Sequence, residues 1–388
     1  MKAETIAFFI TGLNKGGAET QLKRLASVLK EEGREVHVVS LLAIGEQGRR
    51  DRVEGVNYHS LGMERGKARV GDLYRAVRLL REIEPDVVTC FCFHANLLGA
   101  IAGKLAAVPV VISSIRGERF GSRAREWAEI ALDRLGLRDV VTTNSKHVAD
   151  GLIERRIARE EKTVVMPNGI VTDAYRAGNG AAREIRRELG IDEDRFMWLA
   201  VGNLRSAKDY PTLLRAFPYL GVESEAVLCI AGGMHDESVV SEVEMLRHDL
   251  GAPERVRLLG ARDDVPRLLA GADGFVLSSA HEGLPNAVME ALSASVPVVA
   301  TDVGGVRELV VHGESGFVVP PRDSEALAEG MMTMMDLEEG QRAMMGRMGA
   351  EHIEERFGLQ EVVRRWDRLF SEMLEARREG KKPELLGL

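Results

Sequence analysis

Two glutamates eight positions apart, Glu282 and Glu290, stand in a segment suited to bind a phosphate and hydroxyl groups. The segment reads SSAHEGLPNAVME over residues 278–290 and follows a strand-like run, Gly274–Leu277. Pro285 suits the first turn of a helix, where its missing N–H costs nothing. Backbone amides at the start of a helix bind phosphate well, and here they belong to Gly283, Leu284, Asn286 and Ala287. Carboxylates beside a phosphate can accept hydrogen bonds from hydroxyls, some on a sugar and some on a ribose.

Cations for such a phosphate stand in a second segment, VGNLRSAKDY over residues 201–210, at the end of the strand-like run Phe196–Gly202. Fixed cations beside a phosphate stabilise the negative charge that develops when one of its bonds breaks. We expect Lys208 and Arg205 to supply these cations without a metal ion, and Asn203 to contact the same ligand. The predicted catalytic group is therefore Glu282, Lys208 and Arg205.

The first half of the chain offers a smaller set of candidates. Gly16 and Gly17 follow the first strand-like run, and glycine lets backbone approach a ligand closely. His94 and Arg116 each follow a later strand-like run. A lone histidine is more often a structural group, whereas Arg116 would favour an anionic ligand. We assign Gly17 to the diphosphate, and Gly16, His94 and Arg116 to the second substrate.

Apolar runs and amphipathic stretches alternate along the chain. The strands and helices that they predict must position the two segments, residues 201–210 and 278–290. Val and Ile dominate the apolar runs with little polar alternation, as in a parallel sheet covered on both faces. The series restarts after residues 167–182, which are rich in Pro, Gly, Asn and Ala. We therefore predict two doubly wound α/β domains. Ligands bind beyond the carboxyl ends of the strands in such sheets, so two clefts would face each other.

The expected elements follow from the same pattern. Strands are expected at Thr5–Ile10, Val36–Leu42, Asp86–Cys90, Val108–Ser113, Val140–Thr142, Phe196–Gly202, Ala226–Ala231, Val256–Leu259, Gly274–Leu277, Val296–Thr301 and Phe317–Val319. Helices are expected between them, and the chain turns wholly helical after Asp323. The last helix, Gln360–Arg378, carries Trp366, Leu369 and Phe370, and we expect it to cross back and pack on the first domain.

The sequence resembles the retaining GT-B glycosyltransferases, in particular family GT4. The resemblance rests on the Glu282-x7-Glu290 spacing within EGLP, on PVVATDVGG over residues 297–305, on GGAE at 16–19 and on PNGI at 167–170. It implies a GT-B fold with an acceptor-binding domain over residues 1–170, completed by a helix at about 358–378. Residues 171–357 would form the nucleotide-sugar-binding domain.

The resemblance also implies roles for the site residues. Glu290 would hold the ribose hydroxyls of the donor, Glu282 the hydroxyls of the transferred sugar, and the amides that follow Glu282 the distal phosphate. The acceptor would attack from the face that the leaving phosphate occupies, without a nucleophilic side chain. The donor is a substrate, so no cofactor and no metal are expected, and a UDP-sugar is the first choice.

Three departures from the family pattern stand out. Asn203 occupies the position where the family has Arg, so Arg205 is expected to supply the guanidinium. Ile115-Arg116-Gly117 stands where many members have His, which again points to an anionic acceptor. Ser295 stands where Gly often precedes Val-Pro.

Composition limits the remaining function classes. Residues 1–170 hold 27 basic and 22 acidic side chains, whereas residues 171–388 hold 25 and 38. A basic first half suggests an anionic partner. Arg116, Arg119, Arg123 and Arg125 would attract anionic lipid, and family members often act on lipid-linked acceptors at a membrane surface. Nucleic acid is not expected, because the whole chain is acidic and lacks aromatic residues beside its basic ones.

No run is long enough for a membrane helix, and no signal peptide is expected. Cys90, Cys92 and Cys229 lie in apolar runs and are expected to be reduced thiols in a cytoplasmic protein, at most peripheral to the membrane. Two alternatives stay open beside the transferase: a nucleotide-sugar epimerase of similar fold, and a catalytically silent nucleotide-sugar-binding protein. A dinucleotide-dependent oxidoreductase is excluded, because no Gly-x-Gly-x-x-Gly follows the first strand.

Overall fold

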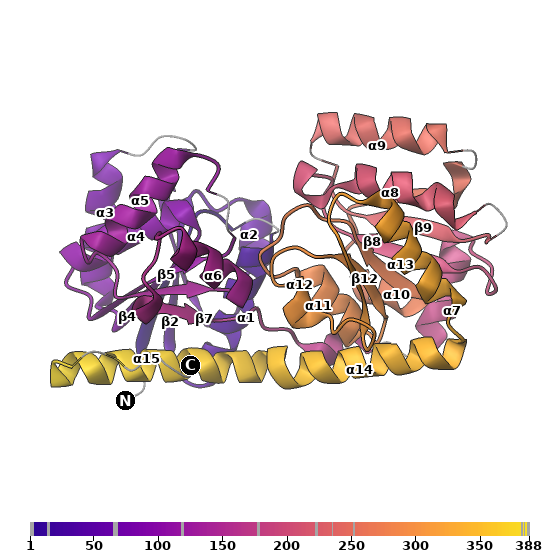
Figure 1. Ribbon diagram of the computed structural model, residues 1–388. Coiled ribbons are helices and arrows are strands. Elements are labelled where there is room, and N and C mark those ends of the chain that lie inside the picture. The colour runs from indigo at the N-terminus through magenta and orange to yellow at the C-terminus, as the bar shows by residue number, and fades with distance from the viewer. Residues whose placement is uncertain are drawn as a thin grey trace. The chain divides into compact units, whose positions relative to one another are not determined.

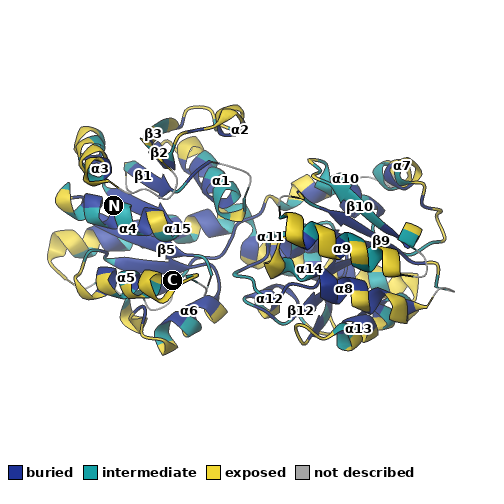
Figure 2. Ribbon diagram, turned by 90° about the horizontal axis from the view of Figure 1, so that it is seen from above, coloured by how far each residue is buried: buried dark blue, intermediate teal, exposed yellow. Residues whose placement is uncertain are grey.

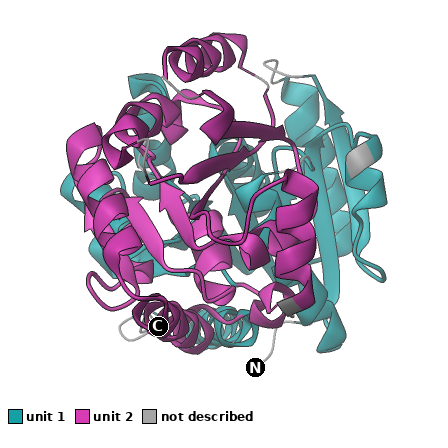
Figure 3. Cartoon of the chain, turned by 90° about the vertical axis from the view of Figure 1, so that its right-hand side faces the viewer, with its two compact units in different colours: residues 1–169, 359–388 teal, residues 170–358 magenta. Residues whose placement is uncertain are grey.

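The chain forms two compact units, each with its own parallel sheet. The computed structural model describes residues 4–13, 16–64, 69–117, 120–176, 179–221, 224–234, 236–250, 253–381, 383 and 385. Unit 1 consists of Met1–Gly169 and Leu359–Leu388, and unit 2 is the continuous segment Ile170–Gly358 (Figure 3). Helices cover both faces of each sheet, so the prediction of two doubly wound α/β domains is confirmed.

The sheet of unit 1 has seven parallel strands in the order β3-β2-β1-β4-β5-β6-β7. The strands are β1 (Thr5–Ile10), β2 (Glu35–Leu42), β3 (Asn57–Met63), β4 (Val87–Phe91), β5 (Val110–Ile115), β6 (Val140–Thr143) and β7 (Thr163–Val165). Their side chains are mostly buried, as the continuous apolar runs predict (Figure 2). The strand order reverses between β1 and β4, which creates a switch point at the carboxyl edge.

The two faces of this sheet carry separate layers of helices (Figure 1). On one face lie α3 (Val70–Ile83), α4 (Phe93–Leu105) and α5 (Arg123–Arg134), and on the other lie α1 (Gly17–Glu31) and α15 (Leu359–Glu379). The ring of Trp366 in α15 lies 6.2 Å from that of Phe91. The prediction that the terminal helix packs on the first domain is therefore confirmed. Two shorter helices, α2 (Glu46–Arg50) and α6 (Lys146–Glu154), complete the unit.

The sheet of unit 2 has six parallel strands in the order β10-β9-β8-β11-β12-β13. They are β8 (Met197–Val201), β9 (Val227–Ala231), β10 (Val256–Gly260), β11 (Gly274–Leu277), β12 (Val298–Thr301) and β13 (Gly316–Val319). One face is covered by α7 (Asn179–Leu189), α10 (Val265–Gly271), α11 (Asn286–Ser293), α12 (Val306–Leu309) and α14 (Glu339–Phe357), and the other by α8 (Tyr210–Ala216), α9 (Glu237–Asp249) and α13 (Ser324–Asp336).

Several details differ from the sequence prediction. The edge strand β3 reads NYHSLGM and lacks an apolar run, so its pattern gave no signal. The helix expected over Tyr210–Leu220 ends at Ala216 and continues as a 3-10 turn that contains Pro218. The predicted linker over residues 167–182 holds a 3-10 turn at Thr172–Tyr175 and the start of α7. No helix in the described part of the chain is long and apolar enough to cross a membrane.

Candidate functional site

The clearest cluster of polar side chains lies at the carboxyl edge of the sheet of unit 2. Strands β8 and β11 pair directly, and the strand order reverses between them. Ligands bind at such a switch point, beyond the carboxyl ends of the strands. The loop after β8 carries Lys208 and the loop after β11 carries Glu282. The topology of the sheet therefore brings together two residues that are 74 positions apart in the sequence.

Lys208 and Glu282 form an ion pair. The Nζ atom of Lys208 donates to Oε1 of Glu282 at 2.6 Å, and the hydroxyl of Ser279 donates to the same oxygen at 2.7 Å. The side chains of Lys208 and Glu282 are 23% and 14% exposed, so both can still meet a ligand. A charge-assisted pair of this kind holds a cation and a carboxylate at fixed positions.

Hydrogen bonds to backbone carbonyls of the loop after β8 fix the position of Lys208. The amide of Ala280 donates to the carbonyl of Ala207 at 2.9 Å, and the hydroxyl of Ser278 donates to the carbonyl of Lys208 at 2.9 Å. The buried phenol of Tyr210 donates to the carbonyl of Gly202 at 2.7 Å. Burial, and then the charge of Glu282, raises the pKa of Tyr210, which therefore keeps its proton and this hydrogen bond.

A third loop, after β12, closes on the backbone of Glu282. Gly304 has a φ of +55°, and a Cβ atom there would lie 2.4 Å from the carbonyl oxygen of Glu282. The amide of Gly305 donates to the carbonyl of Gly283 at 2.7 Å. Only glycine combines this conformation with this close approach. The Gly-Gly pair thus anchors the segment that carries the candidate carboxylate.

Helix α11 begins three residues after Gly283, and its amino end has no side-chain cap. Pro285 is the N-cap residue, and the helix begins directly after it at Asn286. The side chain of Leu284 is buried in the core of unit 2, so only its backbone is available to a ligand. Glu290 lies partly exposed in the same helix, together with Asn286 and Ala287.

The two remaining candidates of this cluster, Arg205 and Asn203, differ in their surroundings. Arg205 is exposed on the loop after β8, and within the described residues its side chain makes no hydrogen bond or ion pair. The side-chain oxygen of Asn203 accepts a hydrogen bond from the amide of Gly233 at 2.9 Å. Asn203 therefore ties the loop after β8 to the loop after β9, while Arg205 is the cation that projects from it.

The candidates from the first half of the chain all belong to unit 1. Gly16 and Gly17 form the uncapped amino end of α1. His94 is exposed in the first turn of α4, where burial of its ring and then the charge of Arg125 lower its pKa. Arg116 follows β5 and is partly buried. Of the predicted basic cluster, Arg119 lies outside the described residues.

Arg116 contacts neutral groups. Its guanidinium donates to the hydroxyl of Ser114 at 3.3 Å and to the side-chain oxygen of Asn168, and it lies 5.3 Å from the ring centre of Phe91. Desolvation by these neighbours lowers the pKa of Arg116 to about 10, so the side chain remains charged.

Sequence reasoning did not identify the supporting residues Ser279, Tyr210 and Gly304. Ser279 lies in the same segment as Glu282 and Gly304 lies in the PVVATDVGG motif, but the sequence alone did not show that either residue supports Glu282. Asn168 lies in the PNGI motif, but its contact with Arg116 could not be predicted from the sequence, because the two residues are 52 positions apart.

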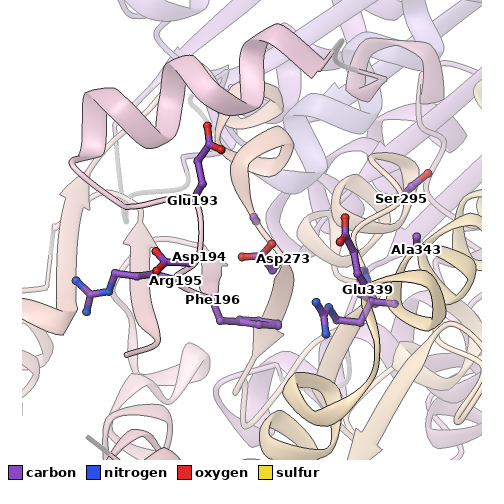
Figure 4. A pocket seen from close by; sticks show the side chains of 11 residues that line it. Glu193, Asp194, Arg195, Phe196, Asp273, Ser295, Glu339 and Ala343 are labelled. Atoms are coloured by element: carbon purple, nitrogen blue, oxygen red, sulfur yellow. The ribbon is translucent and has the colours of Figure 1, made fainter. Parts of the chain in front are cut away.

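A separate cavity of about 380 Å³ lies at the opposite edge of the same sheet (Figure 4). Its lining includes Phe196, Asp273 and Pro297, which directly precede β8, β11 and β12, so it opens at the amino ends of these strands. Asp273 accepts hydrogen bonds there from the amide of Met197 at 2.7 Å and from Arg186, and thereby anchors the strand start. This cavity takes no part in the cluster around Lys208. Within the described residues, no group of three or more His, Cys, Asp or Glu is placed to hold a metal ion.

Comparison with known proteins gives matches over most of the chain. The family model described as Glycosyl transferases group 1 matches residues 181–352, and that of Glycosyltransferase Family 4 matches residues 15–174. UDP-Gal:alpha-D-GlcNAc-diphosphoundecaprenol alpha-1,3-galactosyltransferase of Escherichia coli is 26% identical over 67% of this chain and 68% of that protein.

Two further relatives extend this picture. GDP-mannose-dependent alpha-(1-6)-phosphatidylinositol monomannoside mannosyltransferase of Mycobacterium tuberculosis is 28% identical over 76% of this chain and 77% of that protein. The crystal structure of Anabaena Alr3699/HepE in complex with UDP superposes with a TM-score of 0.84 at 22% identity, over 95% of this chain and 99% of that one.

Proposed function

Since the chain belongs to the glycosyl transferases of group 1 and has the GT-B fold, we propose that it transfers a sugar from a nucleotide-diphosphate sugar to a hydroxyl group of an acceptor, with retention of configuration. The observation that carries the proposal is the ion pair of Lys208 and Glu282 at the switch point of unit 2, where Glu282 lies four residues before the uncapped helix α11. A UDP-sugar is the preferred donor, because the similar Anabaena structure holds UDP and the Escherichia coli relative is named for UDP-Gal.

The donor-binding roles follow from the chemistry of each group. The amides at the start of α11 bind the distal phosphate, Glu282 accepts hydrogen bonds from the transferred sugar, and Glu290 accepts them from the ribose. Lys208 and Arg205 neutralise the charge that develops on the leaving diphosphate, so no metal ion is required. In this scheme the ammonium group of Lys208 moves from Glu282 toward the phosphate, while a sugar hydroxyl takes its place on Glu282.

The proposed reaction needs no nucleophilic side chain. The bond between the anomeric carbon and the phosphate oxygen breaks, and the electron pair stays with the diphosphate. The acceptor oxygen bonds to the same face of the anomeric carbon, and its proton passes to an oxygen of the leaving phosphate. Fixed cations stabilise the leaving group throughout, which is where most of the rate acceleration of such an enzyme arises.

We further propose an acceptor that is linked to a lipid, in line with the names of the two relatives. Helix α5 supports a peripheral membrane contact, because Trp127 in the helix and Leu135 at its C-cap are 65% and 71% exposed. The helix also exposes the cations Arg123 and Arg125. Aromatic and aliphatic side chains among arginines suit the interface of an anionic bilayer. Flotation with anionic vesicles should recover the wild-type protein but less of Trp127→Ser. Equal recovery of both would contradict a contact through α5.

A panel of nucleotide sugars tests the proposed activity. A ligand that binds only the folded state raises the unfolding temperature by mass action, so a scan with UDP-, GDP- and ADP-sugars identifies the donor. Product analysis with that donor then separates the alternatives: a transferase yields nucleoside diphosphate and a glycoside, an epimerase yields an isomeric nucleotide sugar, and a silent binding protein yields no product. Either of the last two results would refute the transferase.

A further inference from the structure

Arg116 is a partly buried cation of unit 1 that makes no ion pair with any described residue. Its contacts within the described residues are the hydroxyl of Ser114, the amide oxygen of Asn168 and the face of Phe91. The two buried arginines among the described residues of this unit differ from it, because Arg34 pairs with Asp367 at 2.7 Å and Arg138 pairs with Glu129. A desolvated charge without a counterion is costly unless a ligand supplies the opposite charge.

The surroundings of Arg116 suit a bound anionic ligand. Arg116 follows β5 at the carboxyl edge of the sheet, next to the switch point between β1 and β4. The amide of Cys92 donates to the carbonyl of Ser114 at 3.2 Å, and Cys92 is the N-cap residue of α4. The thirteen-residue helix α4 thus begins beside Arg116, without a side-chain cap and without an acidic residue in its first turn.

The contact with Asn168 fixes the guanidinium in place. Asn168 is 4% exposed and directly precedes Gly169, the last residue of unit 1 before the chain passes to unit 2. The backbone of Gly169 is held on both sides, because its amide donates to Gln21 at 2.7 Å and its carbonyl accepts from Arg24 at 2.9 Å. Only part of the donor set of Arg116 is used by Ser114 and Asn168, so the remaining N–H groups can serve a planar or tetrahedral oxyanion.

We propose that Arg116, together with the start of α4, binds a phosphoryl group of the acceptor. This inference rests on the proposed function, because it assigns the acceptor to unit 1 while the donor is held by Lys208, Arg205 and α11 of unit 2. The phosphoryl group can belong to a lipid headgroup or to a small soluble phosphate ester, and recognition by Arg116 is the same in both cases.

The test uses the full-length protein saturated with UDP, so that the phosphate subsites of the donor are already filled. Glycerol 3-phosphate is titrated into the wild type, into Arg116→Gln and into Arg134→Gln. Glutamine can still donate to Asn168, so Arg116→Gln should fold. Arg134 is an exposed arginine of α5, and its substitution changes the net charge equally. We expect glycerol 3-phosphate to bind at least tenfold more weakly to Arg116→Gln, and equally well to the wild type and Arg134→Gln.

Two further measurements distinguish a lipid phosphate from a soluble one, and a role of Arg116 in acceptor binding from a role in donor binding. Flotation with phosphatidylcholine vesicles, with and without phosphatidic acid, shows whether the Arg116→Gln substitution also weakens recognition of a lipid phosphate. Calorimetry with UDP alone should give the same affinity for Arg116→Gln and the wild type. Equal binding of glycerol 3-phosphate to all three proteins, or no binding to the wild type, would overturn the proposal. So would a weaker affinity of Arg116→Gln for UDP, since Arg116 would then serve the donor. Failure of the wild type to bind any nucleotide sugar would refute the proposed function instead.

Discussion

At the scale of single residues, the proposed chemistry depends on Lys208, on Glu282 beside it and on Glu290 in α11. Ser279 and Lys208 donate to one oxygen of Glu282, and Gly304 packs on its backbone. Within this shell, Ser279 and Gly304 hold Glu282 in place before a donor arrives, so only Lys208 has to move in the proposed reaction. Arg205 lacks such a shell within the described residues, and its substitution should therefore affect the reaction without affecting the fold.

Substitution of Lys208 or Glu290 by alanine should abolish donor binding or transfer while the protein stays folded. The loss of one preorganised charge at a leaving group lowers kcat roughly 100- to 1,000-fold. Arg205→Ala should lower kcat in the same direction and leave the unfolding midpoint in urea unchanged. Calorimetry and initial rates with the donor found by the thermal scan provide the measurements. Wild-type affinity and turnover in both Lys208→Ala and Glu290→Ala would exclude this site.

At the scale of elements, the pairing of β2 with β3 introduces a dependence of stability on pH. The Nδ1 atom of His37 and the Nε2 atom of His59 lie 3.0 Å apart, so one of these nitrogens donates to the other. Burial, and then the charge of His37, lowers the pKa of His59, while Glu82 opposes the shift. The folded protein therefore binds fewer protons at His59 than the unfolded chain does just below the ordinary histidine pKa of about 6.5.

This proton difference makes the folded state less stable in acid. The contribution of His59 is fully present above a pH of about 6.5 and is lost as the pH falls through its lowered pKa in the folded state. The urea midpoint should fall between pH 7.5 and pH 5.5, and it should fall less in His59→Gln, which has no titrating ring. An equal fall in both proteins would show that His59 does not contribute.

The sequence predicted elements where burial is continuous along the chain, and it failed where burial depends on distant partners. β11 is buried throughout and β1 is buried from Ile6 to Ile10, so their apolar runs were sufficient. The edge strand β3 has one buried residue, Leu61, and its place depends on β2 instead. The same contrast holds in the site: local motifs pointed to Glu282 and α11, whereas the contact of Arg116 with Asn168 depends on the folded topology.

At position 295 the backbone conformation, rather than burial, decides which residue fits best. Ser295 has a φ of +58° and an exposed side chain. A left-handed conformation strains any residue with a Cβ atom, and glycine avoids this strain. The glycine that the family resemblance leads us to expect at this position would therefore avoid a strain that Ser295 carries.

At the scale of the whole molecule, the two units differ in how much of the chain each one needs. Unit 2 is continuous and has an apolar cluster on each face of its sheet. Unit 1 needs α15 from the end of the chain, because Trp366 and Phe370 are 2% and 0% exposed within its core. Loss of one such aromatic side chain costs about 3–5 kcal/mol, which is a large part of the stability of an ordinary domain.

A fragment of residues 170–358 should therefore fold and bind UDP, whereas residues 1–169 should not fold alone. Near-ultraviolet circular dichroism and urea unfolding measure the folding of each fragment, and calorimetry measures UDP binding. The matched control joins residues 1–169 to 359–388 by a short flexible linker, which restores α15. A cooperative transition of residues 1–169 without α15, or an unfolded 170–358 fragment, would contradict this view of the units.

The two places where the chain passes between units lie next to each other. The amide of Ile170 donates to the carbonyl of Phe357 at 2.9 Å, and a Cβ atom on Gly169 would lie 2.8 Å from Leu359. Unit 2 is thus inserted into the sequence of unit 1, and its first residue lies beside its last residues. A gene segment for unit 2 could be exchanged for that of a relative with both junctions at one spot. We expect the chimeric protein to have the nucleotide-sugar preference of the relative that supplied unit 2. Its acceptor preference should remain that of the protein that supplied unit 1.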